Sequence, residues 1–99
     1  MAASPDQDTS IADLRLAVRQ FVTARDWDQY HTPKNLAMSI AIEAAEIMEH
    51  FQWYTPEEVQ TRLADEQERF EVADELADVL IYCLSFANSV DIDVTTAVL

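Results

Sequence analysis

The chain has 99 residues, no glycine and a formal net charge of −13. This length fits one compact domain, and the absence of glycine excludes the glycine-rich loops that bind phosphates and dinucleotides. The acidic surface repels nucleic-acid backbones, so we expect no polymer partner; a small anionic ligand stays possible where a bound divalent cation reverses the local charge.

Capping residues predict where the first helix begins. Residues 1–9 are small and polar, and we expect a flexible N-terminal tail that leaves 10–99 as the domain. Ser10, with Asp13 three residues later, resembles a capping box. A helix over about 11–25 follows from this start and from the apolar residues after it.

Prolines mark the starts of later helices. Residues 26–34 form a connector, and Pro33 suits the first turn of the next helix. Pro56 marks another start, and the polar residues 57–70 form either a short helix or the lead-in to a long one. The remaining helices are predicted over about 34–51, 66–89 and 94–99. The fold class is therefore all-α, a helical bundle of the four-helix type that oligomerisation completes, as is common for domains this small.

A single cysteine and the lack of long apolar runs indicate the cellular setting. Cys83 lies in an apolar stretch, where a small buried residue is expected more than a nucleophile. No leader-like segment opens the sequence, and no apolar run reaches about 18 residues. We expect a cytoplasmic protein without a membrane partner.

The pattern acid-x-x-acid-aliphatic occurs twice. Glu43 and Glu46 form the first pair, and Glu75 and Asp78 form the second, with 28 residues between the pairs. On a helix the two acids of each pair lie about 60° apart and border the apolar stripe. If the stripes of the two helices pack together, both pairs face one cleft beside the core.

Four carboxylates in one cleft repel each other unless a cation neutralises them. Mg²⁺ (or Mn²⁺) accepts oxygen ligands and can bridge substrate phosphates, and a carboxylate that does not bind metal could activate a water molecule. The alternative is that both pairs are ordinary solvated acids, and spacing alone does not decide between these interpretations. A di-iron bundle is disfavoured, because Ile47 precedes His50 by three residues and His31 lies in a connector.

The flanking motifs carry a family resemblance. Arg25–Leu36 (RDWDQYHTPKNL), Phe51–Trp53 (FQW) and Glu75–Tyr82 (ELADVLIY) surround the two acid pairs. Together they resemble the MazG-like all-α nucleotide pyrophosphohydrolases, closest to the dCTP pyrophosphatase branch. The resemblance covers about residues 11–99.

The resemblance implies hydrolysis of a dCTP-like or non-canonical (deoxy)nucleoside triphosphate to the monophosphate and pyrophosphate. It implies Mg²⁺ held by Glu43, Glu46, Glu75 and Asp78, with Glu43 and Glu46 catalytic, in a homo-oligomer that is commonly a tetramer and otherwise a dimer. The implied substrate-binding residues are Trp27, His31, Lys34, Asn35, Trp53 and Tyr82. From the residues alone, core packing of the tryptophans and a backbone hydrogen bond of His31 are the alternatives.

Two departures from the family pattern bear on activity. The family usually continues with a segment whose Lys and Asn reach the phosphates, whereas this sequence ends at Leu99. We expect either a truncated chain, a substitute element or weak activity. Val18 stands where some members place a histidine that contacts the base, so cytosine preference does not follow from the resemblance. The alternative function is a non-catalytic oligomerisation or nucleotide-binding module.

Overall fold

The computed structural model describes residues 4–99, and all regular structure within that range is helical. This confirms the all-α prediction. None of the helices in the described range is long and apolar enough to cross a membrane. The elements are α1 (Pro5–Asp8), α2 (Ile11–Ala24), the 3-10 helix η1 (Asp28–Tyr30), α3 (Pro33–Glu49), α4 (Pro56–Ala64), α5 (Glu66–Val90) and α6 (Val94–Val98).

Side-chain caps begin the helices where the sequence predicts. Ser10 Oγ accepts from the Asp13 backbone N–H, and Asp13 Oδ2 accepts from the Ser10 N–H, each at 3.0 Å, so the capping box is confirmed. Asp65 Oδ2 likewise accepts from the Glu68 N–H at 3.0 Å. Because Asp65 is in the extended region (φ −77°, ψ 127°), it separates α4 from α5, and the short-helix alternative for this stretch is correct.

A single helical turn, α1, forms within the segment that was expected to be a flexible tail. Ser4 and Gln7 exchange capping hydrogen bonds around it, and every residue of the turn is exposed. This turn is not predicted by the sequence pattern. Residues 1–3, the rest of the expected tail before Ser4, lie outside the described residues.

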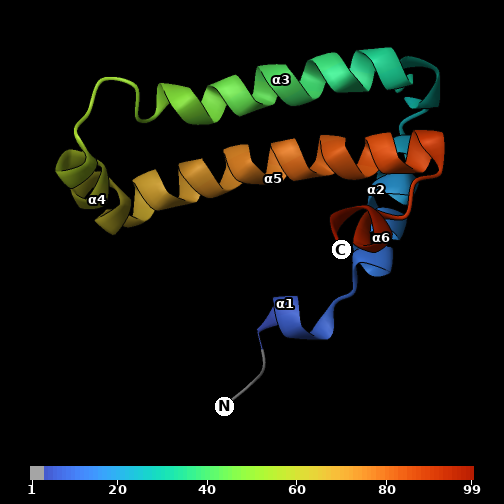
Figure 1. The fold of residues 1–99 in the computed structure, drawn as a ribbon, viewed down its shortest axis with the longest axis horizontal. Coiled ribbons are helices and arrows are strands. Elements are labelled where there is room, and N and C mark those ends of the chain that lie inside the picture. Colours follow the sequence, from blue (N-terminus) through green and yellow to red (C-terminus); the bar gives the residue numbers. More distant parts are fainter. Residues whose placement is uncertain (1–3) are drawn as a thin grey trace.

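Helix α5 is the element against which the others pack. It runs side by side with α3, while α4 contacts one end and α2 crosses the other (Figure 1). Val18 and Val22 of α2 meet Leu84 of α5 in the core, with Val94 packed against them. Leu36, at the start of α3, is the most buried large side chain at 1% exposure.

Arg15 fixes α2 to the C-terminal end of α5. Its Nε donates to Asn88 Oδ1 at 2.9 Å, and its Nη1 donates to the Ile92 carbonyl at 2.7 Å. Asn88 Nδ2 donates back to the Arg15 carbonyl at 3.1 Å. Bonds from a charged donor are stronger than neutral ones, so this network helps to hold α2 against the end of α5.

Much apolar surface is left open. The exposed area is 7562 Å². A compact monomer of 11.3 kDa exposes about 5,700 Å², so the chain has roughly 1,800 Å² in excess. Ala44 and Leu76 are apolar neighbours of the acid pairs, and both are exposed, Leu76 at 51%. Half-buried Glu43 and Glu75 lie between α3 and α5, so apolar residues alone do not form this interface.

Two helices end in a left-handed residue without glycine. Asp26 (φ 55°) follows α2, and Asp91 (φ 56°) follows α5. The Trp27 N–H donates to the Val22 carbonyl at 3.0 Å, and the Asp26 N–H donates to the Thr23 carbonyl at 3.1 Å. These two hydrogen bonds form a Schellman motif. Aspartate tolerates this conformation better than most residues, so it takes the role that glycine usually has.

Replacements of Asp91 should reveal this backbone requirement. We expect Asp91→Ala to have a lower free energy of unfolding than Asp91→Gly by about 1 kcal/mol, because a Cβ atom is unfavourable at positive φ. Asp74, within α5 and exposed, is the control: there Ala should exceed Gly by about 1 kcal/mol. Denaturant unfolding measures both pairs, and the same order at both positions would contradict the assignment.

Candidate active site

Three carboxylates meet between α3 and α5. Glu43 comes from α3, while Glu75 and Asp78 come from α5 one turn apart, and one oxygen of each lies within 4.8 Å of the others. Glu43 and Glu75 are half-buried, and Asp78 is exposed. The side-by-side course of the two helices therefore joins the two acid pairs that the sequence holds far apart.

Electrostatics at this cluster favour a cation. The pKa of Glu43 is raised above its ordinary 4.5, first by burial and then by the negative charges of Asp78 and Glu75. The donors are hard oxygens, which is the donor set that Mg²⁺ and Mn²⁺ prefer. The residues present therefore fit a divalent cation.

Glu46 stands beside this cluster. Its carboxylate is not among the three that lie within 4.8 Å of one another. Its pKa is nevertheless raised, above all by the charge of Glu49, next by burial, and then by Glu75 and Glu43. The structure thus brings together three of the four predicted metal ligands, with the fourth electrostatically coupled to them.

An aromatic pocket of about 470 Å³ adjoins the carboxylates. Trp27 and His31 are stacked with centroids 6.3 Å apart at 23°, and His31 lies 6.1 Å from Tyr82. Phe21 meets Trp27 edge-on at 5.5 Å. The pocket is lined by Phe21, Val22, Trp27, Tyr30, His31, Asp78, Ile81 and Tyr82. A flat ring system fits such a wall, because aromatic faces stack on one another.

Asp78 belongs to both features. It contributes to the carboxylate cluster, and it also lines the aromatic pocket. Tyr82 follows one turn later on α5 and continues the pocket wall. One ligand with an anionic end and an aromatic end could therefore occupy both parts at once.

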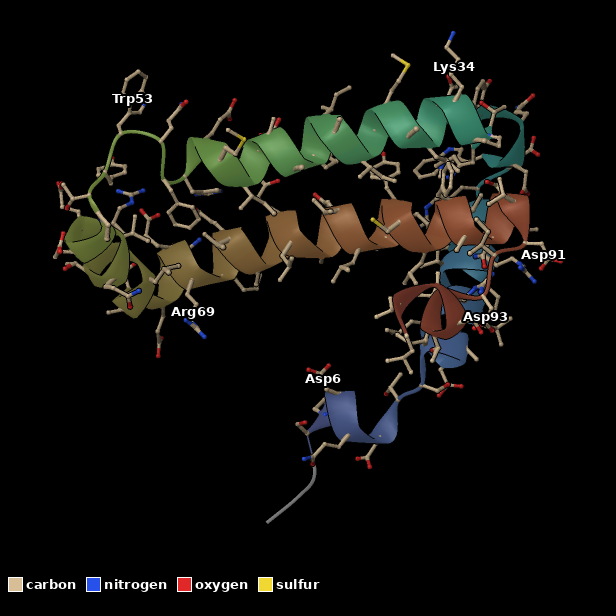
Figure 2. The ribbon with its side chains drawn as sticks, in the orientation of Figure 1. Asp6, Lys34, Trp53, Arg69, Asp91 and Asp93 are labelled. Atoms are coloured by element: carbon tan, nitrogen blue, oxygen red, sulfur yellow. The ribbon has the colours of Figure 1, made fainter. Side chains whose placement is uncertain are left out.

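Three of the predicted substrate-binding residues do not line this pocket. Trp53 is 81% exposed in the connection after α3, and Lys34 is exposed at the other end of α3 (Figure 2). Asn35 Nδ2 donates to the Tyr30 carbonyl at 3.1 Å, so its amide stabilises the turn before α3. Within one chain, the predicted substrate-binding residues therefore do not all lie in one pocket.

Some pocket residues were missed by the sequence analysis. Phe21 of α2 lines the pocket at 43% exposure, with the Arg25 guanidinium 3.5 Å from its ring centroid. Tyr30 and Ile81 also line it. Tyr30 and Ile81 lie within the family motifs Arg25–Leu36 and Glu75–Tyr82, and this position is the sequence signal that could have identified them. Cys83 is free and half-buried and is not a lining residue.

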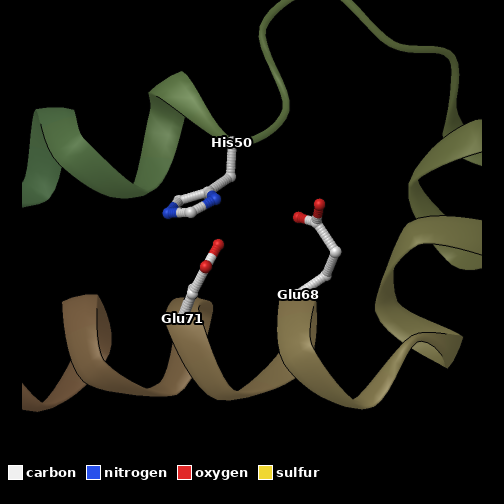
Figure 3. Close-up of side chains that lie close together, drawn as sticks. All are labelled: His50, Glu68 and Glu71. Atoms are coloured by element: carbon white, nitrogen blue, oxygen red, sulfur yellow. The ribbon is translucent and has the colours of Figure 1, made fainter.

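A second mixed cluster lies near the other end of the α3–α5 pair. His50, Glu68 and Glu71 point toward one another (Figure 3), with one ligand atom of each within 4.8 Å of the others. Glu68 already accepts from Arg62 Nη2 at 2.9 Å, and His50 Nε2 lies 4.0 Å from Glu75. We interpret this cluster as an ionic network that joins the end of α3 to α4 and α5.

The fold and the site define a class: an all-α domain with a carboxylate cluster beside an aromatic pocket. The model of the MazG-like family matches residues 38–99, so the chain belongs to that family. It is 36% identical over 92 residues to "dCTP pyrophosphatase 1" of Homo sapiens and 35% identical to that of Bos taurus. These matches cover 93% of this chain and 54% of the relatives, so the chain spans about half their length.

A solved structure matches this chain over nearly its whole length. The crystal structure of a pyrophosphatase from Archaeoglobus fulgidus matches with a TM-score of 0.79 and 39% identity. The match covers 99% of this chain and 86% of that one. The family resemblance inferred from the motifs is confirmed by these comparisons.

Carboxylate repulsion makes stability depend on pH. The folded state raises the pKa of Glu43, so its stabilising contribution is full below pH 4.5 and is lost as pH rises through the higher folded value. We expect Glu43→Gln, without divalent cations, to melt roughly 2–4 °C above the parent at pH 7 and level with it below about pH 4.

Thermal melts with and without Mg²⁺ measure this effect. Mg²⁺ should raise the melting midpoint of the parent at pH 7 more than that of Glu43→Gln, because the bound cation balances the negative charges of the carboxylates. Asp74→Asn, an exposed neutralisation on α5, is the control and should respond to Mg²⁺ as the parent does. An equal Mg²⁺ response in parent and Glu43→Gln would count against the cluster.

Proposed function

We propose that the domain hydrolyses a (deoxy)nucleoside triphosphate, dCTP-like or non-canonical, to the monophosphate and pyrophosphate, with Mg²⁺ as cofactor. The observation that carries this proposal is the position of Asp78 in both the carboxylate cluster and the aromatic pocket. A nucleotide has a ring at one end and phosphates at the other. The names of the relatives support this reaction class.

In this proposal the carboxylates have two roles, metal binding and activation of a water molecule. Glu43, Glu75 and Asp78, together with Glu46, are the residues that would hold Mg²⁺, with Mn²⁺ as a possible replacement. Bound metal would neutralise charge that develops on the phosphates. Glu43 and Glu46 are the catalytic residues in this proposal. In this proposal Glu46 orients a water molecule and takes its proton, and its raised pKa beside the cluster supports that role.

The aromatic residues bind the base. Stacking of a base on Trp27 would contribute about 1–3 kcal/mol. His31 and Tyr82 complete the wall and supply polar atoms for the base edge. Lys34, Asn35 and Trp53 remain predicted substrate-binding residues. In this proposal they contact the nucleotide from outside the pocket of their own chain, since none of them lines it.

A second copy of the chain covers the open apolar face. Leu14 and Phe21 of α2 and Leu80 of α5 line a groove of about 400 Å³ whose walls are entirely apolar residues. Phe21 and Ile81 line both this groove and the aromatic pocket, so a copy seated there would abut the base site. The excess surface of roughly 1,800 Å² is enough for a stable dimer or tetramer interface. The 81% exposed Trp53 could then reach a nucleotide held by another subunit.

The proposed setting is the cytoplasm, where the nucleotide pool is maintained.

Pyrophosphate release tests the reaction. We expect the chain to release pyrophosphate and monophosphate from dCTP or a modified dNTP with Mg²⁺, and to stop when the metal is chelated. Asp78→Asn should lower kcat/KM at least 100-fold, about 3 kcal/mol, because it alters both cluster and pocket. Chromatography identifies the products across a panel of nucleotides.

Asp74→Asn, one turn before Asp78 and exposed, is the matched control and should keep activity within about 3-fold of the parent. If the folded protein releases no pyrophosphate from any nucleotide in the panel, the catalytic proposal fails. Nucleotide binding without turnover would instead favour the non-catalytic binding module. Diphosphate as product would place the attack at a different phosphorus.

The oligomer is tested through the apolar groove. Leu80 is 52% exposed, and we expect Leu80→Glu to shift the assembly toward monomer, because a charge at the centre of an apolar interface is costly. Light scattering coupled to size exclusion gives the mass. Gln60→Glu, which adds the same charge on exposed α4, should leave the assembly unchanged. A parent that is monomeric throughout would contradict the proposal.

A further inference from the structure

Ser85 is the one polar side chain classed as buried in the described residues, at 6% exposure on α5. Its Oγ lies 3.0 Å from Nδ1 of His31, a residue 54 positions earlier in the chain. A buried hydroxyl is costly unless it is hydrogen-bonded. The pair therefore links the interior of α5 to the aromatic pocket.

The direction of this hydrogen bond follows from the surroundings of the hydroxyl. Helical serines often donate to a carbonyl of the preceding turn, as Ser89 does one turn later, to Phe86 at 2.8 Å. No such bond is recorded for Ser85 in the described part of the chain, where its partner is the His31 ring. If Nδ1–H were the donor, the hydroxyl hydrogen would have no protein acceptor among the described residues. A hydroxyl that donates to Nδ1, with the ring proton on Nε2, satisfies both groups within the protein.

His31 stands between two hollows. It lines the aromatic pocket, and it also lines a smaller hollow of about 180 Å³ on whose wall Ser85 lies. Its ring is held at a tilt of 23° to Trp27 and 32° to Tyr82. The Nδ1 edge is occupied by Ser85, so the Nε2 edge is the one available to a ligand.

We propose that Ser85 is a positioning residue that holds His31 as the Nε2–H tautomer, so that His31 donates a hydrogen bond to an oxygen of the bound nucleotide. This inference rests on the proposed function for the identity of the ligand. The acceptor is an oxygen of either the base or the phosphates, and an Nε2–H donor suits both. An exocyclic amine is itself a donor, so this tautomer disfavours it as the partner.

Nitrogen NMR of ¹⁵N-histidine-labelled protein tests the tautomer directly, without any nucleotide. In a spectrum recorded at about pH 8, the two ring nitrogens of a neutral imidazole have different shifts and so report which one carries the proton. We expect His31 in the parent to show a protonated Nε2 and an unprotonated Nδ1. Ser85→Ala should give a tautomer mixture, Ser85→Thr should keep the parent pattern, and Ser89→Ala is the control.

Binding and kinetics test the consequence for the ligand. With dCTP and Mg²⁺, Ser85→Ala should raise KM about 3- to 10-fold, the loss expected for one hydrogen bond, while kcat changes less than about 3-fold. Ser85→Thr should restore KM. Weaker binding of deoxycytidine as well as dCTP assigns the acceptor to the base, whereas an effect confined to dCTP assigns it to the phosphates.

The outcomes separate this inference from the proposed function. A parent spectrum with the proton on Nδ1 overturns the assignment of Ser85 as donor. An unchanged tautomer and unchanged binding in Ser85→Ala overturn the positioning role. If the parent turns over no nucleotide, the proposed reaction fails, while the NMR result still decides the Ser85–His31 pair.

Discussion

Repulsion among carboxylates between α3 and α5 is the constraint on which the rest of the structure depends. Glu43 and Glu75 are half-buried where two helices pack, and the pKa of Glu43 is raised first by burial and then by the negative charges of Asp78 and Glu75. An interface of this kind is unfavourable in water without a counter-charge. A divalent cation bound between these carboxylates would relieve their electrostatic repulsion.

The same two helices carry part of the open apolar surface. Glu43 and Glu75 are half-buried between α3 and α5, while the apolar residues Leu76 and Ala44 are exposed. The groove that includes Leu80 continues this surface onto α2. The two helices therefore combine an acidic cluster between them with apolar side chains left exposed.

The aromatic pocket is built by backbone geometry as much as by side-chain type. Asp26, at φ 55°, reverses the chain after α2, and Trp27 begins the connector that carries the pocket wall. His31 then contacts α5 through Ser85. The connector is therefore held at both ends, by a Schellman turn and by a buried hydroxyl, and its rings keep a fixed tilt.

The sequence alone determined the helices, their caps and the composition of the site. Local signals sufficed for these, because capping boxes and prolines act within a few residues, as at Ser10 and Pro33. The repeat of acid pairs was also visible, since helical periodicity places Glu75 and Asp78 on one side. The flanking motifs identified the family, which geometry by itself left undecided.

Only the tertiary structure decided which of these residues meet. It brought Glu43, Glu75 and Asp78 together, set Glu46 beside them, and placed Trp53 and Lys34 at opposite ends of α3. It also gave a partner to Ser85, which in sequence is one serine among apolar residues. The physical reason is that the rotation of α3 against α5 depends on packing across distant segments, and no local pattern specifies that angle.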